Sequence, residues 1–575
     1  MLAAFALVSC SSDDVVNEAS LPMNPDGTTY LSVKIAADRG TRGQDAGFEY
    51  GKAYEHAVTS ADFYFYDADG AYVATAQVWN GGKENLVRPD ENIEYFGNNV
   101  IVLKGLTEKT FPKYLVTVLN QPEDFVPGDN LKDMETKLTS VLNRTISGEI
   151  TNFVMSTTSY KHDDGNDVSG QPTYFTTEVK STDFQKDPTA VKDVTPVEIY
   201  VERLAAKVNV ATDNSTLVPV EGLENTYELK VSVAGDPNAE DNDDNVGAEV
   251  VRVKFEGWGL NATAKETHIV KNINVDWSLG NFVWNEPENF RSLWGMGTAY
   301  NKELDENGTY GSLLNYNTWT QLSKVGFGAD AYCGENTNVA SILDSHIGVA
   351  ATSVVVAATI LHQDKDGNWV SPNMIRFNGM LFTEANFKAY ALRNLNTLGQ
   401  LNYYRKTSVY DEDGTTVVRI EYNQLNADDV EVVNSTEGDN SVVKLALTTA
   451  AKATDWYQKN ADGTYSETPI RTELTALSKF SGNGYKGGKM YYNIPIQHLY
   501  EDAAEGIQEG EYGVVRNHYY KLTITSLEKL GTGVWNPDGS EWPIVPPPTP
   551  DPDYYQLGAK INILSWRVVD QTVGL

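Results

Sequence analysis

The chain has 575 residues, which is long enough to bury at least two substantial hydrophobic cores, so we expect two domains or one domain with large insertions. Its 79 acidic and 45 basic side chains give a net charge of −34, which argues against nucleic acid as a partner because the phosphate backbone would be repelled. The 32 tyrosines, the 46 glycines and the many alternating apolar patterns favour an all-β protein with many turns and minor helical insertions.

The first ten residues predict a lipoprotein signal segment. A short apolar run ends in Leu7-Val8-Ser9-Cys10, and the bacterial lipoprotein pathway requires small residues just before a cysteine whose thiol is then acylated. The alternatives are an ordinary apolar leader with an accidental cysteine and a disulfide between Cys10 and Cys333. The run lacks a charged n-region, so we expect it to lie inside a longer signal peptide. No later run reaches the roughly 20 apolar residues of a spanning helix, so lipid on Cys10 is the expected anchor.

A polar tether leads from the signal segment to the first predicted strand. In TTYLSVKIAA, residues 28–37, apolar and polar side chains alternate, so one face can be buried; it carries Leu31, Val33, Ile35 and Ala37. The segment ADRGTRGQD follows at 37–45, where Arg39 and Arg42 stand among small and polar residues that could not bury them. A soft joint marked by two arginines thus separates one strand from the rest of the chain.

From residue 60 onward the pattern is strand, turn, strand, interrupted by two predicted helices. The first helix spans 130–144 and places five apolar residues at helical spacing: Leu131, Met134, Leu138, Val141 and Leu142. The second spans 383–395 and has one apolar face, formed by Phe387, Tyr390, Ala391 and Leu395. Between them, residues 250–270 are interpreted as a junction between domains.

Five short acidic turns resemble the start of a calcium-binding loop: DADG (67–70), DENG (305–308), DKDG (364–367), DEDG (411–414) and NADG (460–463). An EF-hand loop also needs a bidentate carboxylate at its twelfth position. That position holds Val78, Tyr316, Ile375, Tyr422 and Arg471, and none of them is a carboxylate. Asp-Gly and Asn-Gly between strands instead predict hairpin turns, because glycine adopts the positive φ that these turns need.

The sequence contains no recognisable catalytic or metal-binding motif. The seven histidines are scattered without an HExxH or a second ligand at metal spacing, and the chain has neither a CxxC, a GxSxG nor a phosphate-binding loop. Paired glycosidase carboxylates are conceivable among 79 acidic residues, but the sequence gives no way to choose a pair. We therefore expect no enzyme, no cofactor and no metal; a secreted hydrolase is an alternative without named residues.

The chain ends in a proline-rich leash, residues 537–553, followed by a last predicted strand at 554–575. The leash is too rich in proline for sheet or helix and is typical of polyproline II. With no partner after it, we expect the strand to find none in its own chain, and such an apolar strand is an aggregation hazard without a destined groove. We therefore predict a donor strand for another molecule, carried by Tyr555, Leu557, Ala559, Ile561, Ile563, Trp566, Val573 and Leu575.

These features resemble the shaft pilins of Bacteroidales fimbriae, in particular the minor-fimbrium (Mfa-type) major subunit family. The resemblance covers most of the chain and is strongest at its C-terminal end, in VVRNHYYKLTITSLEKLG, the leash and ILSWRVVDQTVGL. Four further blocks resemble core and junction positions of the family: VERLAAKVNV (201–210), GWGLNATAKETHIVKNI (257–273), FRSLWGMGTAYN (290–301) and YCGENT (332–337). In the last block, Cys333 is expected to be a small buried residue.

The resemblance implies two tandem β-sandwich domains of transthyretin-like type. The expected order is a signal segment (1–10), a tether with a removable N-terminal strand (11–42), the two domains (43–262 and 263–536), the leash and the donor strand. It further implies an outer-membrane lipoprotein precursor that an arginine-specific protease cuts after Arg42, or after Arg39 as the fallback. The mature chain would then polymerise head-to-tail with identical subunits and with accessory tip and anchor pilins in a surface fimbrium.

The alternative from another class is a monomeric surface lipoprotein that binds glycan through exposed tyrosines and tryptophans. Such a protein would keep its N-terminal strand and would not need a leashed C-terminal strand. The pair of similar end strands around an arginine-marked joint therefore favours the fimbrial subunit.

Overall fold

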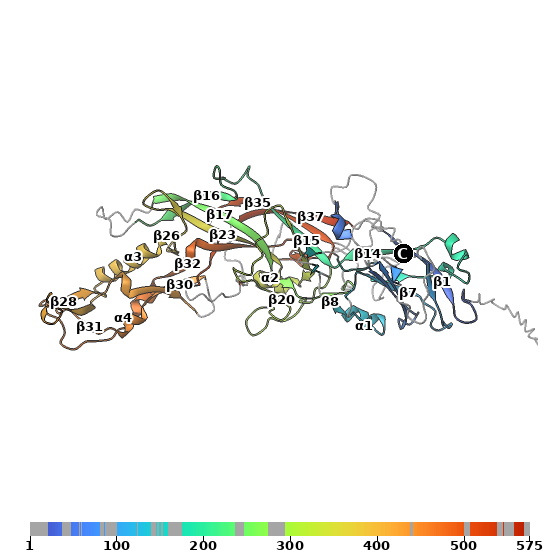
Figure 1. Cartoon of the computed structure of the whole chain (residues 1–575), viewed down its shortest axis with the longest axis horizontal. Helices are drawn as coiled ribbons and strands as arrows, with labels where there is room; N and C mark the ends of the chain where they lie inside the picture. Colours follow the sequence, from blue (N-terminus) through green and yellow to red (C-terminus); the bar gives the residue numbers. More distant parts are fainter. Residues whose placement is uncertain are drawn as a thin grey trace, which may run out of the picture.

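The molecule is elongated and is built from β-sheets along its whole length (Figure 1). The computed structural model describes residues 21–36, 48–56, 58, 60–80, 85–86, 100–122, 125–139, 145–146, 149–150, 153–158, 175–235, 247–273, 294–436, 441–499, 506–536, 544 and 557–567. Helices are few and short within this part of the chain: α1 (Leu131–Thr136), α2 (Ala340–Ala350), α3 (Glu384–Thr397) and α4 (Thr449–Ala453). None of these helices has the length and apolar character needed to span a membrane. The predicted all-β class with minor helical insertions is confirmed.

The first domain is one sheet system in the order β13-β1-β14-β11-β7-β3-β4-β5, with β12 on β7 and β6 on β1. The strands are β1 (Thr29–Ala36), β3 (Ser60–Tyr66), β4 (Tyr72–Asn80), β5 (Asn85–Leu86), β6 (Val100–Leu103), β7 (Tyr114–Leu119), β11 (Met155–Thr157), β12 (Thr177–Glu178), β13 (Phe184–Gln185) and β14 (Val197–Arg203). Along β3 the side chains alternate between two apolar clusters, Phe63 and Phe65 in one and Tyr64 and Tyr66 in the other. The sheet is therefore buried on both faces at its centre.

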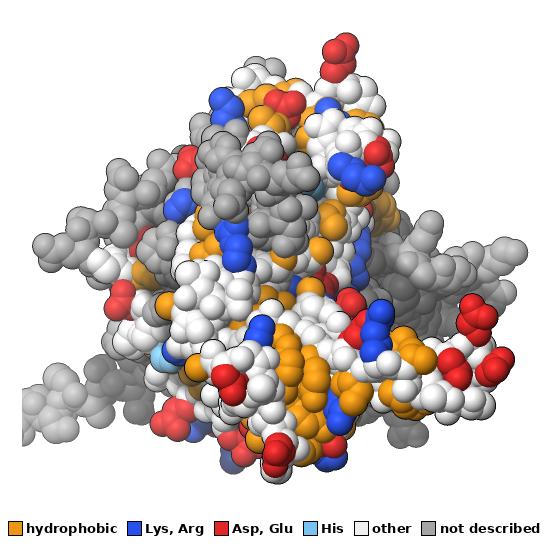
Figure 2. Space-filling view, turned by 90° about the vertical axis from the view of Figure 1, so that its left-hand side faces the viewer, with side chains coloured by type: hydrophobic (Ala, Val, Ile, Leu, Met, Phe, Trp, Pro, Cys, Tyr) orange, Lys and Arg blue, Asp and Glu red, His pale blue; other side chains and the backbone are white. Residues whose placement is uncertain are grey.

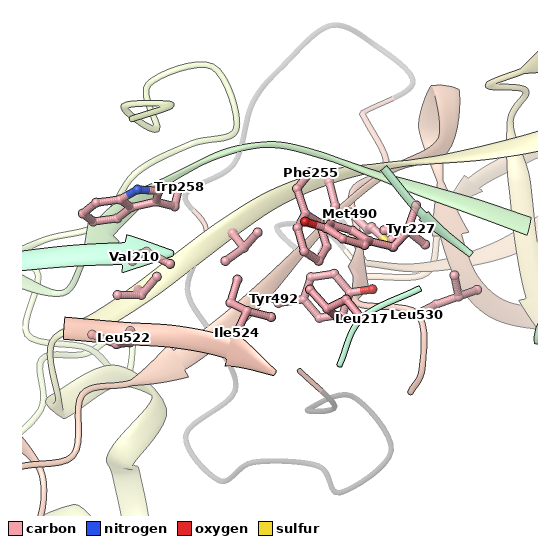
Figure 3. Packing of buried hydrophobic residues seen from close by; sticks show 14 of the residues in the cluster. Val210, Leu217, Tyr227, Phe255, Trp258, Met490, Tyr492, Leu522, Ile524 and Leu530 are labelled. Carbon is pink, nitrogen blue, oxygen red and sulfur yellow. The ribbon is translucent and has the colours of Figure 1, made fainter. Parts of the chain in front are cut away.

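The second domain is a β-sandwich of a five-stranded and an eleven-stranded sheet. The smaller sheet has the order β2-β37-β35-β15-β21, formed by Phe48–Tyr50, Leu557–Arg567, His518–Leu527, Ala205–Thr212 and Asp330–Gly334. The larger sheet contains β16 (Thr226–Val233), β17 (Gly247–Asn261), β23 (Ser353–Gln363), β24 (Trp369–Val370), β25 (Met374–Phe377), β26 (Met380–Thr383), β29 (Val430–Asn434), β30 (Val442–Leu447), β32 (Ser481–Tyr485), β33 (Lys489–Pro495) and β36 (Thr532–Gly533). Figure 3 shows the core between the sheets, where Leu522 and Ile524 of β35 lie across from Phe255 of β17 and Tyr492 of β33.

The far end of the second domain carries α3 and a three-stranded sheet in the order β28-β27-β31, formed by Val417–Gln424, Tyr404–Tyr410 and Trp456–Tyr457. Helix α3 begins after Thr383, whose side chain accepts a hydrogen bond from the Asn386 amide, and it buries Phe387, Ala391 and Leu395. The predicted second helix and its apolar face are thus confirmed. Figure 2 looks onto this end, where apolar side chains lie open among charged ones; Tyr410, Val417, Val418 and Ile420 are exposed.

The first predicted helix is shorter than expected. α1 ends at Thr136, and only Leu131 and Met134 are buried, so its apolar face covers little more than one turn. The chain then forms β8 (Leu138–Thr139), which pairs with β19 (Thr267–His268) and leaves Leu138 42% exposed. Pairing with a distant strand therefore overrides the helical spacing here. Val141 and Leu142 lie outside the described residues.

Core membership changes earlier in the sequence than the expected boundary at 262. Ala205 packs in the first domain's core, whereas the next residue, Ala206, packs in the core of the second. β15 pairs with β21 and β35, and β17 lies between β16 and β23 at the middle of the large sheet. The interpretation of 250–270 as a junction is therefore wrong for β17, which is a central strand of the second domain.

Three of the acidic turns join antiparallel strands, as predicted. DADG connects β3 to β4, DKDG connects β23 to β24, and DEDG connects β27 to β28, with glycine φ values of 78°, 85° and 69°. NADG lies within the bridge between Lys459 and Tyr465, whereas DENG forms a tight turn that does not join two strands of the described part. No group of histidine, cysteine, aspartate and glutamate within the described ranges could hold a metal ion.

Candidate assembly site at the N-terminal strand

The N-terminal strand β1 lies inside the first sheet and pairs on both of its sides. Its first half runs antiparallel to β6, with Leu31 opposite Ile101, and also pairs with β13. Its second half runs parallel to β14, with Lys34 opposite Glu198. β1 thus joins β6 and β13 to the rest of the sheet, and in the described part of the chain no other strand makes this link.

The side chains of β1 are buried as the alternation predicts. Leu31 and Val33 are 0% and 1% exposed and pack in the core of the first domain, whereas Lys34 is exposed. Thr29 continues this buried face, and Ser32 on the opposite face is buried as well, which alternation alone did not reveal. Two members of the predicted face lie outside the described part: the side chain of Ile35, and Ala37.

A tight turn fixes the start of β1 against the sheet. Gly27 has a φ of +77°, and its carbonyl accepts a hydrogen bond of 3.1 Å from the Leu106 amide. A Cβ at residue 27 would lie 2.3 Å from the Leu106 nitrogen, so this approach requires glycine. Leu21 and Met23, before the turn, add apolar contacts to the same core. Loss of residues 21–36 would therefore open a slot lined by apolar side chains and by unpaired backbone groups of three strands.

The arginine joint connects this slot to the second domain. β1 ends at Ala36 in the first sheet, and the next described strand, β2, begins at Phe48 in the five-stranded sheet of the second domain. The expected processing residues Arg39 and Arg42, and the expected lipidation residue Cys10, lie outside the described residues. Only eleven residues, 37–47, separate the two strands.

The C-terminal strand has a partner in its own chain, so the expectation that it would not pair locally is wrong. β37 runs antiparallel to β35, and its register places Ala559, Ile561 and Ile563 opposite Ile524, Leu522 and Tyr520, three buried residues. On its other side it pairs with β2, where Trp566 lies opposite Glu49. β35 pairs with β15 on one side and accepts β37 on the other, and the sequence did not reveal this second edge. Tyr555, Val573 and Leu575 lie outside the described part.

A largely buried cluster of charges, with Lys52 at its exposed edge, holds the segment after β2 against the second domain. The Lys207 ammonium lies 2.9 Å from a Glu55 carboxylate oxygen and 3.4 Å from an Asp330 oxygen, and Lys52 lies 2.7 Å from the same Asp330 oxygen. Glu55 also accepts a hydrogen bond from the Tyr332 hydroxyl. Lys52 and Glu55 follow β2, whereas their partners lie on β15 and β21, so the cluster fixes residues 52–55 against the five-stranded sheet.

The two carboxylates of this cluster predict acid sensitivity. Burial opposes the ionisation of Glu55, but hydrogen bonds from Tyr332 and Lys207 outweigh it, so its pKa lies below the usual value. Burial likewise opposes the ionisation of Asp330, and hydrogen bonds from Lys52 and Asn209 hold its pKa low. A lowered folded-state pKa gives stability that is present above the unfolded values, about 4.3 and 3.9, and is lost as the pH falls through the folded values.

We therefore expect the free energy of unfolding to fall steeply below about pH 4. Glu55→Gln should cost about 1–3 kcal/mol at neutral pH, because Lys207 loses a charged acceptor, and should flatten the acid slope. Denaturant unfolding between pH 3 and 7 measures both effects. Asp455→Asn, at the exposed pair with Arg471, is the control that should leave the slope unchanged. An identical slope in Glu55→Gln and the unaltered chain would contradict the prediction.

The sequence blocks expected at core and junction positions meet around Arg516, which is fully buried. Its guanidinium donates to Glu335 at 3.3 Å and to the carbonyl oxygens of His268 and Ile269 at 2.8 and 3.3 Å. A second buried ion pair joins Lys271 and Glu202, which are 3.5 Å apart and both 1% exposed. Three of the four blocks thus supply partners to buried ionic groups.

Cys333 is buried within the block 332–337, and burial raises the pKa of its thiol to about 12. It is 5% exposed and packs in the core of the second domain, which confirms its expected place as a small buried residue.

Comparison with known proteins gives a family match in the C-terminal part of the chain. Residues 483–572 match the family described as major fimbrial subunit protein type IV, fimbrillin, C-terminal. This range contains β33, β35, the leash and β37. Among curated proteins, none matches the chain.

Solved structures that match the chain include a fimbrilin (fimA) from Porphyromonas gingivalis W83, with 13% identity, 94% of this chain and 98% of that chain covered, and a TM-score of 0.35. The tip fimbrial protein Mfa3 from Porphyromonas gingivalis, with C-terminal truncation, has 12% identity, coverage of 94% and 100%, and a TM-score of 0.27. A fimbrial assembly protein from Parabacteroides distasonis has 12% identity, coverage of 70% and 96%, and a TM-score of 0.25. Through residues 483–572, the chain is thus similar to the C-terminal part of the fimbrillin family of major fimbrial subunit proteins.

Proposed function

We propose that this protein is a fimbrillin-like structural subunit of a surface fimbrium that polymerises by strand exchange. Cleavage after Arg42, or after Arg39 as the fallback, releases β1 from the first domain, and the C-terminal strand of a second copy takes its place. The observation that carries the proposal is the position of β1, a central strand with Leu31 and Val33 in the core, directly before the arginine joint. Such a head-to-tail contact is heterologous and gives an open filament.

The two end strands suggest the register of the exchange. Residues 31–36 read LSVKIA and residues 557–562 read LGAKIN, so leucine, lysine and isoleucine recur at the same spacing. In this register Leu557 takes the place of Leu31, and Lys560 takes the place of Lys34, which is exposed and lies opposite Glu198. The acceptor slot would therefore lose an apolar face and one positive charge with β1 and receive the same pattern with the donor strand.

The energetics favour exchange over an empty slot. Burying five or six apolar side chains at ~1.5–3 kcal/mol each gives roughly 10 kcal/mol before the ordering costs are subtracted. Against this, β37 must leave its pairing with β35 and β2 before it can be donated. Pairing with β35 and β2 would keep β37 from pairing with other chains and aggregating until a slot opens.

The earlier steps belong to the same proposal. Cys10 would be acylated and would hold the precursor in the outer membrane until an arginine-specific protease cuts the joint. Identical subunits would form the shaft, with accessory tip and anchor pilins at its ends, as in the minor-fimbrium type. The glycan-binding alternative requires that β1 stay in place for the life of the protein.

Limited cleavage of the purified chain with an arginine-specific protease tests the proposal. We expect the new N-terminus to be Gly43 and negative-stain microscopy to show filaments, because the slot is opened and the donor strand is intact. The chain with both Arg39→Gln and Arg42→Gln is the matched control and should stay monomeric. A cut chain that loses β1 and remains monomeric would contradict strand exchange, and native protein beginning at Cys10 or Ser11 would favour the glycan-binding alternative.

A further inference from the structure

One residue of the proline-rich leash, Ile544, is held in an apolar pocket on the outer face of the large sheet. It is 2% exposed and packs with Trp319, Leu322, Val355, Ala357, Tyr491 and Val534. Along β23, Val354 and Val356 face the core of the sandwich, whereas Val355 and Ala357 face this pocket. The pocket is thus formed by the opposite face of a strand whose other face is the domain core.

The backbone of Ile544 is held as firmly as its side chain. Its amide donates to the Asn317 carbonyl oxygen at 2.6 Å, and its carbonyl oxygen accepts from the Asn261 side-chain amide at 2.7 Å. Asn261 is 0% exposed, and its own oxygen accepts from the Asn317 amide at 2.8 Å. The backbone N–H and C=O of Ile544 are therefore both satisfied, one by Asn317 and the other by Asn261.

The sequence around Ile544 suits this binding. It stands in Trp542-Pro543-Ile544-Val545-Pro546, where the prolines have no amide to donate. Val545, which directly follows Ile544, is biased toward an extended backbone by Pro546. Ile544 therefore supplies both the apolar side chain and the amide that this pocket uses.

We propose that the pocket around Ile544 is a clip that fixes the point from which the donor strand leaves the subunit. Twelve residues, 545–556, then separate the clip from the start of β37, instead of the twenty between Asn536 and Leu557. At ~3.1 Å per residue in polyproline II, the span available to the donor strand falls from about 62 Å to about 37 Å. Where it concerns filaments, this inference rests on the proposed strand exchange; the clip itself is a property of the single chain.

The clip is tested first in the uncleaved, full-length chain. Ile544→Asp places a carboxylate in the apolar pocket and should open the clip, whereas Ile544→Val should keep it. Val545→Asp makes a comparable apolar-to-acidic change at the next position and is the matched control. We expect hydrogen exchange of the peptide containing residue 544 to be about 100-fold faster in Ile544→Asp than in the other two variants and the unaltered chain. Equal exchange in all four chains would overturn the clip.

A second measurement examines the filaments after cleavage. Ile544→Asp should still polymerise, because the slot and the donor strand are unchanged, but the axial spacing between subunits should vary more than in Ile544→Val. Equal variation in the two filaments would show that the clip does not set the departure point. If the unaltered chain forms no filaments, the proposed strand exchange is wrong. The hydrogen-exchange measurement on the single chain still decides whether the clip exists.

Discussion

Ile561→Asp is expected to abolish filament formation by the cleaved chain while both domains remain folded. In the proposed register, Ile561 takes the place of Ile35, which lies opposite Ile199 of β14, a residue that is 0% exposed. A carboxylate buried in such a slot costs several kcal/mol, which is a large share of the roughly 10 kcal/mol expected from exchange. Negative-stain microscopy measures assembly, and circular dichroism with thermal unfolding reports the fold.

The neighbouring position provides the control for this change. Asn562→Asp adds the same charge one residue further along the strand, where the stored position lies opposite Lys521. Because adjacent residues of a strand lie on opposite faces, this variant should polymerise nearly as the unaltered chain does. Normal polymerisation of Ile561→Asp would show that the C-terminal strand is not the donor.

A disulfide between subunits reports the register in the same filaments. The proposed alignment places Lys560 opposite Glu198 of the next subunit, as Lys34 is in the single chain. Lys560→Cys combined with Glu198→Cys should therefore crosslink, since neighbouring strands bring Cα atoms within the 4.4–6.8 Å that a disulfide needs. Asn562→Cys with Glu198→Cys, two residues out of register, should crosslink far less. Cys333 is buried and does not compete for either pairing.

Glu335→Ala is expected to destabilise the protein by about 3–5 kcal/mol, because it leaves the Arg516 charge buried without its carboxylate. Both side chains are 0% exposed, and their atoms Nε and Oε1 are 3.3 Å apart. Arg516 also donates to the Thr267 hydroxyl and to the backbone carbonyl oxygens of His268 and Ile269. Denaturant unfolding measures the loss.

The exposed pair of Arg419 and Glu421 is the matched control for this network. Their closest atoms are 2.6 Å apart, but the side chains are 68% and 40% exposed. Glu421→Ala should therefore cost only about 0–1 kcal/mol, because solvent screens an exposed pair. A similar loss in Glu335→Ala and Glu421→Ala would mean that Arg516 does not depend on Glu335.

The sequence by itself determined the features that depend on neighbours along the chain. The alternation in β1 placed Leu31 and Val33 in the core, the helical spacing placed Phe387, Ala391 and Leu395 on the buried face of α3, and the Asp-Gly turns marked three hairpins. Strand and helix periodicity and the positive φ of glycine act over a few residues, so the local sequence contains them. The match of residues 483–572 to the fimbrillin C-terminal family likewise rests on the sequence alone.

Only the tertiary structure decided which distant segments meet. The helix predicted at 130–144 ends at Thr136 because Leu138 pairs with His268. β37 pairs with the edge of β35 that β15 does not occupy. Ile544 is a leash residue by composition, but it is buried because Asn261 and Asn317 satisfy its backbone groups. Each of these outcomes depends on which backbone edge or apolar face is left unpartnered after the rest of the chain has folded, and periodicity along the sequence contains no information about that.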